Sequence, residues 1–169
     1  MIVALDANCL VAWSSRNNPD NVARLDELLK TVSDAGGKII IPVPCLAEYL
    51  VHLGEATEAW LAALERKKSV VLAPFDKRAA YECAFIDRNA ISNGSKRAGR
   101  TAAWQRIKID RQVIAIAKNH SAKEIISEDK EVRAEAISLG LRARALDELT
   151  LPDSARQNLI PLEPMDDQP

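Results

Sequence analysis

Residues 1–8 read MIVALDAN, and the interpretation of the whole chain starts from this stretch. The apolar run from Ile2 to Leu5 predicts a buried strand, and Asp6 ends that run. A carboxylate beside apolar neighbours loses solvation, so a strand end is a costly place for a negative charge. Three further acids stand where a predicted strand ends or a predicted helix begins: Glu48, Asp110 and Asp129. Four such acids at one edge of a sheet would require a cation.

Strand and helix patterns alternate along the rest of the chain. Apolar runs predict further strands at residues 38–43, 69–73, 124–127 and 141–146. Helical periodicity or capping residues predict helices over 20–35, from Pro44 onward, 56–66, from Asp76 to about 90, 109–119 and 130–139. This alternation predicts an α/β fold with a parallel sheet covered by helices on both faces. Right-handed crossovers place the carboxyl ends of all strands at one edge, where such sheets bind ligands.

Asp6 and Asp129 directly follow predicted strands, so both belong at that edge. Each acid alone has an ordinary structural explanation. Asp6 and Asp129 could cap the helices that follow them, and Glu48 could be solvated or ion-paired. Asp110 could lie in the first turn of a helix, where the helix dipole favours an acid. Their joint placement favours a site for a hard divalent cation, which binds carboxylate and phosphate oxygens together with water.

The length of 169 residues fits a single folded domain, which we place at residues 1–149. Residues 150–169 contain four prolines and no periodicity, and we expect an irregular tail there. The three cysteines share no metal-binding spacing, and with only two histidines they cannot build a zinc cluster, which favours free thiols. With no apolar leader and no run near the roughly 18 apolar residues of a membrane span, we expect a cytoplasmic protein without membrane partners.

A basic flank covers residues 96–123, although the net charge of the whole chain is only -1. Its cations are Lys96, Arg97, Arg100, Arg106, Lys108, Arg111, Lys118 and Lys123. Eight cations minus the one acid, Asp110, give a local charge of +7, which favours a polyanionic partner over a plain solvated loop. We expect the first six cations to contact nucleic acid, and Trp104 either to stack on an unpaired base or to belong to the core. Within this flank, residues 92–101 read as a mobile loop.

Four segments carry a resemblance to a known family: LDANCLVA, PCLAEYL, KIDRQVIAIAK and IISEDKEV. Their order and spacing resemble the PIN domain, particularly the VapC-like toxin ribonucleases of type II toxin–antitoxin systems, over residues 1 to about 147. In that family one acid ends the first strand, a second lies on the helix after strand two, a third opens a helix and a fourth follows strand four. Asp6, Glu48, Asp110 and Asp129 match these positions in order.

Three further residues fall at supporting positions of the family pattern. Asn8 matches the Ser, Thr or Asn beside the metal, and Ser127 matches a small hydroxyl position before the fourth acid. Glu128 is an additional acid, which leaves the fourth ligand open between Glu128 and Asp129. We prefer Asp129 because it matches the family position and the start of a helix.

The resemblance implies a three-layer α/β/α fold with strand order 3-2-1-4-5 and a metal-dependent endoribonuclease that hydrolyses RNA by metal-activated water. Asp6 and Asp110 would be core ligands of Mg²⁺ or Mn²⁺, Asp129 would complete the site, and Glu48 would bind a second ion or orient water. Single-stranded or looped RNA fits an edge site best, because its bases can be splayed out. The resemblance also implies a homodimeric toxin inhibited by a cognate antitoxin that covers the acidic crevice.

Three alternatives stay open. A PIN-fold nuclease could act on DNA, and a non-catalytic PIN-like protein could bind RNA or a partner without cutting it. An aspartyl phosphotransferase with Asp6 as nucleophile would need a second acid two residues later, where Asn8 stands.

Overall fold

The computed structural model describes residues 1–15, 17–51 and 55–156. Within them, five parallel strands form one sheet in the order β3-β2-β1-β4-β5. The strands are β1 (Ile2–Leu5), β2 (Lys38–Pro42), β3 (Val70–Ala73), β4 (Glu124–Ile126) and β5 (Arg142–Arg144). The expected α/β class, all five strands and the strand order are therefore confirmed.

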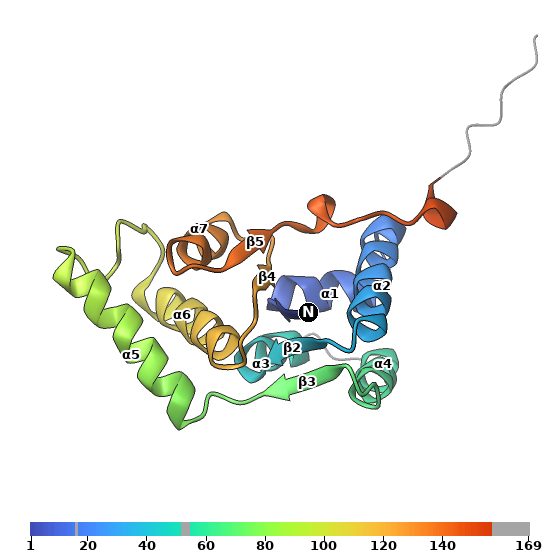
Figure 1. The fold of residues 1–169 in the computed structure, drawn as a ribbon, viewed down its shortest axis with the longest axis horizontal. Coiled ribbons are helices and arrows are strands. Elements are labelled where there is room, and N and C mark those ends of the chain that lie inside the picture. The colour runs from blue at the N-terminus through green and yellow to red at the C-terminus, as the bar shows by residue number, and fades with distance from the viewer. Residues whose placement is uncertain (16, 52–54, 157–169) are drawn as a thin grey trace, which may run out of the picture.

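Helices cover the sheet on both faces, as expected (Figure 1). The helices are α1 (Ala7–Ser15), α2 (Pro19–Asp34), α3 (Val43–Leu50), α4 (Glu55–Glu65), α5 (Lys77–Ser92), α6 (Trp104–Asn119) and α7 (Lys130–Ser138). Helices α2 and α4 lie on one side of the sheet, and α5, α6 and α7 lie on the other, with α5 packed outside α6 (Figure 1). Such three-layer packing buries both faces of a parallel sheet.

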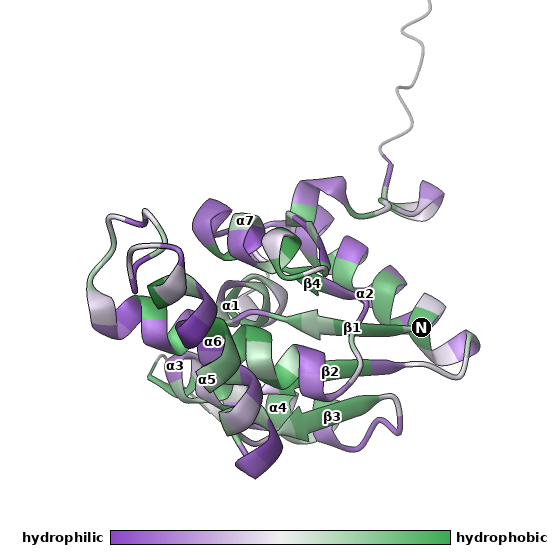
Figure 2. Ribbon diagram, turned by 60° about the vertical axis from the view of Figure 1, so that its left-hand side comes forward, coloured by the Kyte–Doolittle hydropathy of each residue, from purple (hydrophilic) through white to green (hydrophobic). Residues whose placement is uncertain are grey.

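The central strands are apolar on both faces, which explains why they read as continuous apolar runs (Figure 2). Val3, Ile39 and Ile125 are fully buried on three neighbouring strands. A strand that is covered on only one face would alternate between apolar and polar side chains, whereas a strand covered on both faces does not. Packing of the strands in the sheet core therefore determines where each strand ends, and with it the position of the residues that follow the strand.

Side-chain caps define the starts of several helices. Asp76 accepts a hydrogen bond from the Ala79 N–H at the start of α5, which confirms the expected cap. Helix α2 ends before Gly36, whose φ of +62° is the left-handed conformation that glycine adopts without strain. The next residue, Gly37, lies so close to the Met1 carbonyl that a side chain there would collide with it.

Helix α6 begins earlier than the sequence indicated. It starts at Trp104 instead of residue 109, because Ile107 is fully buried and extends the apolar stripe of the helix by one turn. Asp110 therefore lies in the second turn of α6 and does not open the helix. The alternative explanation, that Asp110 lies in the first turn of a helix and is favoured there by the helix dipole, is therefore wrong.

The chain after β5 contains two short 3-10 helices, Leu146–Glu148 and Asp153–Ala155. The rest of the predicted tail, residues 157–169, lies outside the described residues. None of the helices in the described ranges is both long enough and apolar enough to span a membrane. The three cysteines, two buried and one half-buried, are free thiols, as expected.

Candidate functional site

All four predicted acids line one cavity at the carboxyl edge of the sheet. This acid cavity has a volume of about 540 Å³. Asp6 reaches it from the end of β1, Glu48 from α3, Asp110 from α6 and Asp129 from the turn before α7. Residues that are up to 123 positions apart in the chain thus meet where the strand topology places the ends of β1 and β4.

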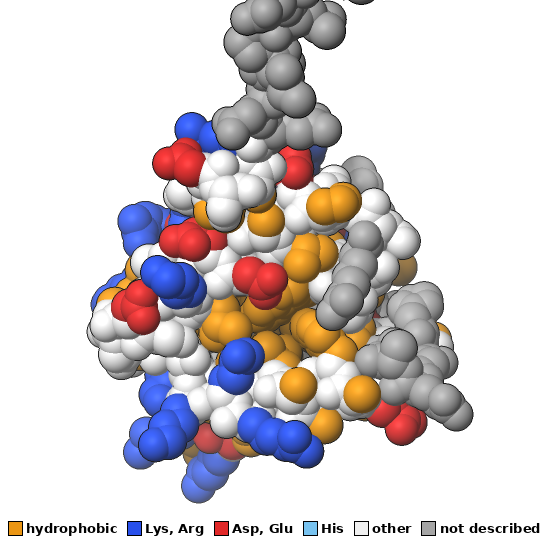
Figure 3. Space-filling model, turned by 90° about the vertical axis from the view of Figure 1, so that its right-hand side faces the viewer, with side chains coloured by type: hydrophobic (Ala, Val, Ile, Leu, Met, Phe, Trp, Pro, Cys, Tyr) orange, Lys and Arg blue, Asp and Glu red, His pale blue; other side chains and the backbone are white. Residues whose placement is uncertain are grey.

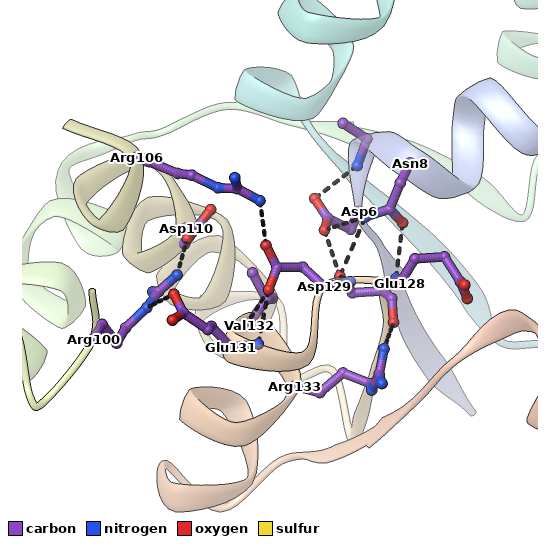
Figure 4. Close-up of polar contacts among 12 residues, drawn as sticks. Asp6, Asn8, Arg100, Arg106, Asp110, Glu128, Asp129, Glu131, Val132 and Arg133 are labelled. Atoms are coloured by element: carbon purple, nitrogen blue, oxygen red, sulfur yellow. Dashed lines mark hydrogen bonds and ion pairs between the residues drawn. The ribbon is translucent and has the colours of Figure 1, made fainter. Parts of the chain in front are cut away.

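Asp6 is held in one orientation by groups from three elements, and Figure 4 shows its contact with Asn8 of α1. Its Oδ1 accepts hydrogen bonds from the Ala7 N–H at 2.7 Å and from the Cys45 thiol at 3.6 Å. Its Oδ2 accepts from the Ser127 hydroxyl at 2.6 Å and from the Asn8 amide at 3.0 Å. A carboxylate fixed in this way at the end of a strand is well suited to be a metal ligand, because it loses little conformational entropy when it binds a cation.

Ser127 and Asn8 connect the ends of β1 and β4. The Ser127 hydroxyl also accepts a hydrogen bond from the Asp129 N–H at 3.1 Å, and the Asn8 Oδ1 accepts from the Glu128 N–H at 3.1 Å. Ser127 is fully buried, so its hydroxyl has an internal role and is not a surface group. Both residues lie where the sequence analysis expected support for the acids.

The two neighbouring acids after β4 point in different directions (Figure 4). Asp129 lines the acid cavity and caps α7 by accepting from the Glu131 and Val132 N–H groups. Glu128 turns away and accepts a hydrogen bond from the Leu146 N–H at 2.7 Å. The structure therefore places Asp129, the preferred residue, at the cavity, and gives Glu128 a structural contact with the segment after β5.

Asp129 both caps α7 and lines the acid cavity. Burial raises the pKa of this carboxyl, but the two backbone N–H groups and Arg106 outweigh burial and hold the pKa below its usual value. Arg106 forms an ion pair with the Oδ2 of Asp129 from α6 (Figure 4). The helix cap fixes one oxygen, and the exposed Arg106 covers the other.

Asp110 is oriented by an arginine from the segment before α6. Arg100 forms ion pairs with Asp110 and with Glu131 of α7 (Figure 4). Burial raises the pKa of Asp110, and although Arg100 opposes this shift, the negative charges of Asp6 and Asp129 add to it. The net direction is upward, so burial and the two neighbouring acids together outweigh the effect of Arg100 on this pKa.

Glu48 is the least constrained of the four acids. It is exposed on α3, and no hydrogen bond or ion pair to its carboxylate occurs among the described residues. Partial burial raises its pKa, and repulsion from Asp6 and Asp110 raises it further, against a smaller opposing effect of Arg106. A side chain that is free and repelled by its neighbours can turn toward a cation that enters the cavity.

Two cations of the basic flank are internal, which corrects the sequence analysis. Arg111 is fully buried and pairs with Asp87 at 2.8 Å and Glu135 at 2.6 Å. Arg100, whose side chain is only 7% exposed, also reaches Glu135, at 2.8 Å. We call these five residues the arginine network: Asp87, Arg100, Arg111, Glu131 and Glu135. Neither arginine is free to contact nucleic acid, since each guanidinium already binds carboxylates of α5, α6 or α7.

The expected mobile loop at residues 92–101 is tied into the same network. The Lys96 carbonyl accepts a hydrogen bond from Arg111 at 2.7 Å, and Arg100 anchors the end of the segment. Trp104 is half-buried, with the Lys96 ammonium 4.9 Å and the Arg111 guanidinium 5.8 Å from its ring centre. Because both cations already lie near the Trp104 ring, the structure favours packing of this side chain within the protein over stacking on an unpaired base. Four of the six expected cations remain exposed: Lys96, Arg97, Arg106 and Lys108.

The three acids of the network were not singled out in the sequence, and its two arginines were expected to contact nucleic acid. Asp87, Glu131 and Glu135 fall at ordinary helical positions, and only the spacing of four between Glu131 and Glu135 shows that they share a face of α7. Their partners come from α6 and from the segment before it, so no local pattern in the sequence indicates the pairing.

The chemistry of the acid cavity fits a hard divalent cation. Four carboxylates supply oxygen donors, and burial together with repulsion between the acids raises the pKa values of Glu48 and Asp110. In the described ranges, no three Asp, Glu, His or Cys side chains stand close enough together to hold an ion as they are placed. A cation would therefore have to draw the carboxylates inward.

A larger cavity, of about 630 Å³, lies at the opposite edge of the sheet. Its wall includes four lysines, Lys30, Lys38, Lys67 and Lys68, and two acids of α2. The acids of this cavity lie on a single helix, and one of them, Asp34, already pairs with Lys30. The acid cavity is the candidate site because acids from four elements converge on it, and not because of its size.

Comparison with known proteins identifies the fold. No family model and no curated protein sequence matches the chain. The fold is similar to that of a chain in the crystal structure of VapBC2 from Rickettsia felis bound to a promoter DNA fragment, with a TM-score of 0.56 and 16% identity. A chain of the DNA-bound VapBC structure from Salmonella typhimurium gives a TM-score of 0.54 and 17% identity. Each comparison covers 86% of this chain and 98% of the other. The protein therefore has the PIN-like, VapC-like fold that its sequence resembled.

Proposed function

We propose that this protein is a metal-dependent endoribonuclease that hydrolyses phosphodiester bonds of RNA. The observation that carries the proposal is the convergence of Asp6, Glu48, Asp110 and Asp129 on one cavity at the carboxyl edge of a PIN-like sheet. Carboxylates whose pKa values are raised by burial and by neighbouring acids in a shared cavity are typical of functional sites.

Mg²⁺ or Mn²⁺ is the proposed cofactor. Asp6 and Asp110 would be its core ligands, Asp129 would complete the site, and Glu48 would bind a second ion or orient water. When bound, such a cation would make a water molecule a stronger nucleophile and would neutralise charge that develops on the phosphate.

The remaining residues of the site have positioning and binding roles in this proposal. Ser127 and Asn8 hold the Asp6 carboxylate in place by donating hydrogen bonds to its Oδ2. Arg106 is 64% exposed at the cavity, so it can leave Asp129 and bind a substrate phosphate when a cation takes its place. Single-stranded or looped RNA fits the open edge of the sheet, where unstacked bases have room.

The proposal is tested with Asp6→Asn and Asp110→Asn beside the parent protein. Each is incubated with Mg²⁺ or Mn²⁺ and a pool of cellular RNA, and cleavage is followed by gel electrophoresis. We expect each substitution to reduce the rate at least 100-fold, which is typical for the loss of a group that stabilises charge in the transition state. Cleavage that survives both substitutions, or survives chelation of the metal, would exclude this mechanism. Parallel single-stranded RNA and DNA substrates distinguish an RNase from a DNase of the same fold.

A second candidate function is non-catalytic binding of RNA or of a partner protein. The ion pairs Arg100–Asp110 and Arg106–Asp129 favour it, because they neutralise two of the four acids without a metal. Calorimetric titration with Mg²⁺ and Mn²⁺ separates the two functions. Absence of binding at millimolar concentrations would support the non-catalytic role.

We also propose that the protein is the homodimeric toxin of a toxin–antitoxin pair. The solved structures with a similar fold come from VapBC complexes. The face that carries α2 and α4 has apolar side chains gathered at its centre (Figure 3), and exposed apolar surface of this kind is what a protein partner covers. A small neighbouring gene for a DNA-binding antitoxin, and co-purification of its product with this protein, would support this role.

A further inference from the structure

Helix α5 sorts its charged side chains between its two sides. The acids Glu82 and Asp87 face α6, where they pair with Lys118 and Arg111. The cations Lys77, Arg78 and Arg88 are exposed, and none has an ion-pair partner within the described residues. One other acid, Asp76, belongs to this helix, and its carboxylate is engaged in the N-cap. The surface of α5 that faces solvent is therefore positively charged without acids to balance it.

The same surface carries large aromatic side chains. Tyr81 is 68% exposed and Phe85 is 57% exposed, and they lie one turn apart, about 6 Å along the helix axis. Ala84, Arg88 and Ile91 share their face of the helix at intervals of three, four and seven residues. We call these five residues, together with the exposed Lys77 and Arg78 one turn before Tyr81, the outer face of α5. The ammonium of Lys77 lies 5.9 Å from the Tyr81 ring centre, so cation and ring already adjoin each other.

This surface continues toward the acid cavity along the chain. The ion pairs Glu82–Lys118 and Asp87–Arg111 align α5 antiparallel to α6, so the C-terminal part of α5 runs beside the turn of α6 that holds Asp110. The connecting segment exposes Lys96 and Arg97, and it leads to Ala103, which lines the cavity. Exposed cations thus follow one another along the chain from the outer face of α5 toward the acid cavity.

We propose that the outer face of α5 binds the single-stranded part of an RNA substrate that extends beyond the acid cavity. Tyr81 and Phe85 would stack on unpaired bases, while Lys77, Arg78 and Arg88 would bind phosphates. Proteins that bind single strands combine a positive surface with aromatic side chains in this way. The inference rests on the proposed function in naming RNA as the ligand, but it concerns a surface that contains none of the four acids.

Charge complementarity favours RNA over a second copy of the chain as the occupant. In an antiparallel pairing of two α5 helices about a two-fold axis, Arg88 of one copy would lie near Lys77 and Arg78 of the other. With no acid on either outer face, these like charges would repel each other. A polyanion meets the same cations with attraction.

Binding is measured with Asp6→Asn protein, so that cleavage does not consume the ligand. A fluorescently labelled, unstructured RNA of about 20 nucleotides is titrated in the presence of Mg²⁺ and followed by anisotropy. Tyr81→Ala and Phe85→Ala should each weaken binding roughly ten-fold, because a stacked base is lost. Arg78→Ala together with Arg88→Ala should reduce the slope of the logarithm of the binding constant against the logarithm of the salt concentration. The expected reduction is about 0.7 for each phosphate contact that is lost. Val51→Ala is the matched control, since Val51 is 79% exposed directly after the end of α3, and it should leave binding unchanged.

Each possible outcome decides the proposal. Unchanged binding in the Tyr81→Ala, Phe85→Ala double variant would overturn it. If that double variant also shifts from dimer to monomer in light scattering, the outer face of α5 is instead an interface with a second copy. The nuclease proposal fails separately, if parent protein with intact Asp6 does not cleave RNA that the Asp6→Asn protein binds through α5.

Discussion

The acid cavity and the arginine network are two groups of carboxylates that share helix α6 but differ in how their charge is balanced. In the arginine network, two buried arginines bind three acids, and every pair lies between 2.6 and 3.0 Å. In the acid cavity, burial and repulsion raise the pKa values of Glu48 and Asp110. Arginines pair with every acid of the network, whereas in the cavity Arg100 and Arg106 pair with Asp110 and Asp129, and Asp6 and Glu48 have no ion-pair partner among the described residues.

The largest effect should come from breaking the arginine network. Arg111→Ala removes a fully buried guanidinium and leaves Glu135 and Asp87 with less compensation, so we expect a loss of about 3–5 kcal/mol in the free energy of unfolding. Urea denaturation followed by circular dichroism measures it. Arg97→Ala is the control, since Arg97 is exposed and should change stability by less than about 0.5 kcal/mol. Equal effects of the two substitutions would show that the network does not stabilise the fold.

A smaller effect should follow from adding a cation to the acid cavity. At Mg²⁺ or Mn²⁺ ten times above the dissociation constant, we expect the free energy of unfolding to rise by about 1.4 kcal/mol, and Asp6→Asn should abolish the rise. Protons compete for the same oxygens, and the raised pKa values mean that Glu48 and Asp110 take up protons at a higher pH than ordinary carboxyls. The metal-induced stabilisation should therefore shrink as the pH falls from 7 toward 5. A pH-independent rise would place the cation elsewhere.

The smallest effect concerns the metal-free cavity. A raised pKa means that the folded state binds the proton more tightly than the unfolded state, so ionised Glu48 destabilises the fold at neutral pH, and this cost disappears at low pH. Glu48→Gln should then raise the free energy of unfolding at pH 7 by up to about 0.5 kcal/mol. Thermal unfolding in the presence of a chelator measures the difference. Glu58→Gln is the control, since Glu58 of α4 is exposed. A loss of stability would contradict the repulsion inferred in the cavity.

The sequence by itself determined the strands, their parallel arrangement and the common location of Asp6 and Asp129. Strand patterns depend on local apolar runs, and a residue that directly follows a strand must lie at the carboxyl edge of a parallel sheet. The order of strands and the positions of Glu48 and Asp110 came from a family resemblance, because both depend on which elements pack together.

Only the tertiary structure decided which charged residues are internal. Arg100 and Arg111 look like Arg97 and Lys108 in the sequence, but their partners lie on α5 and α7, up to 35 positions away. Glu128 and Asp129 are neighbours, and the turn after β4 directs one toward Leu146 and the other into the acid cavity. A local pattern fixes the face on which a side chain begins, whereas the charge that it meets depends on segments brought together by folding.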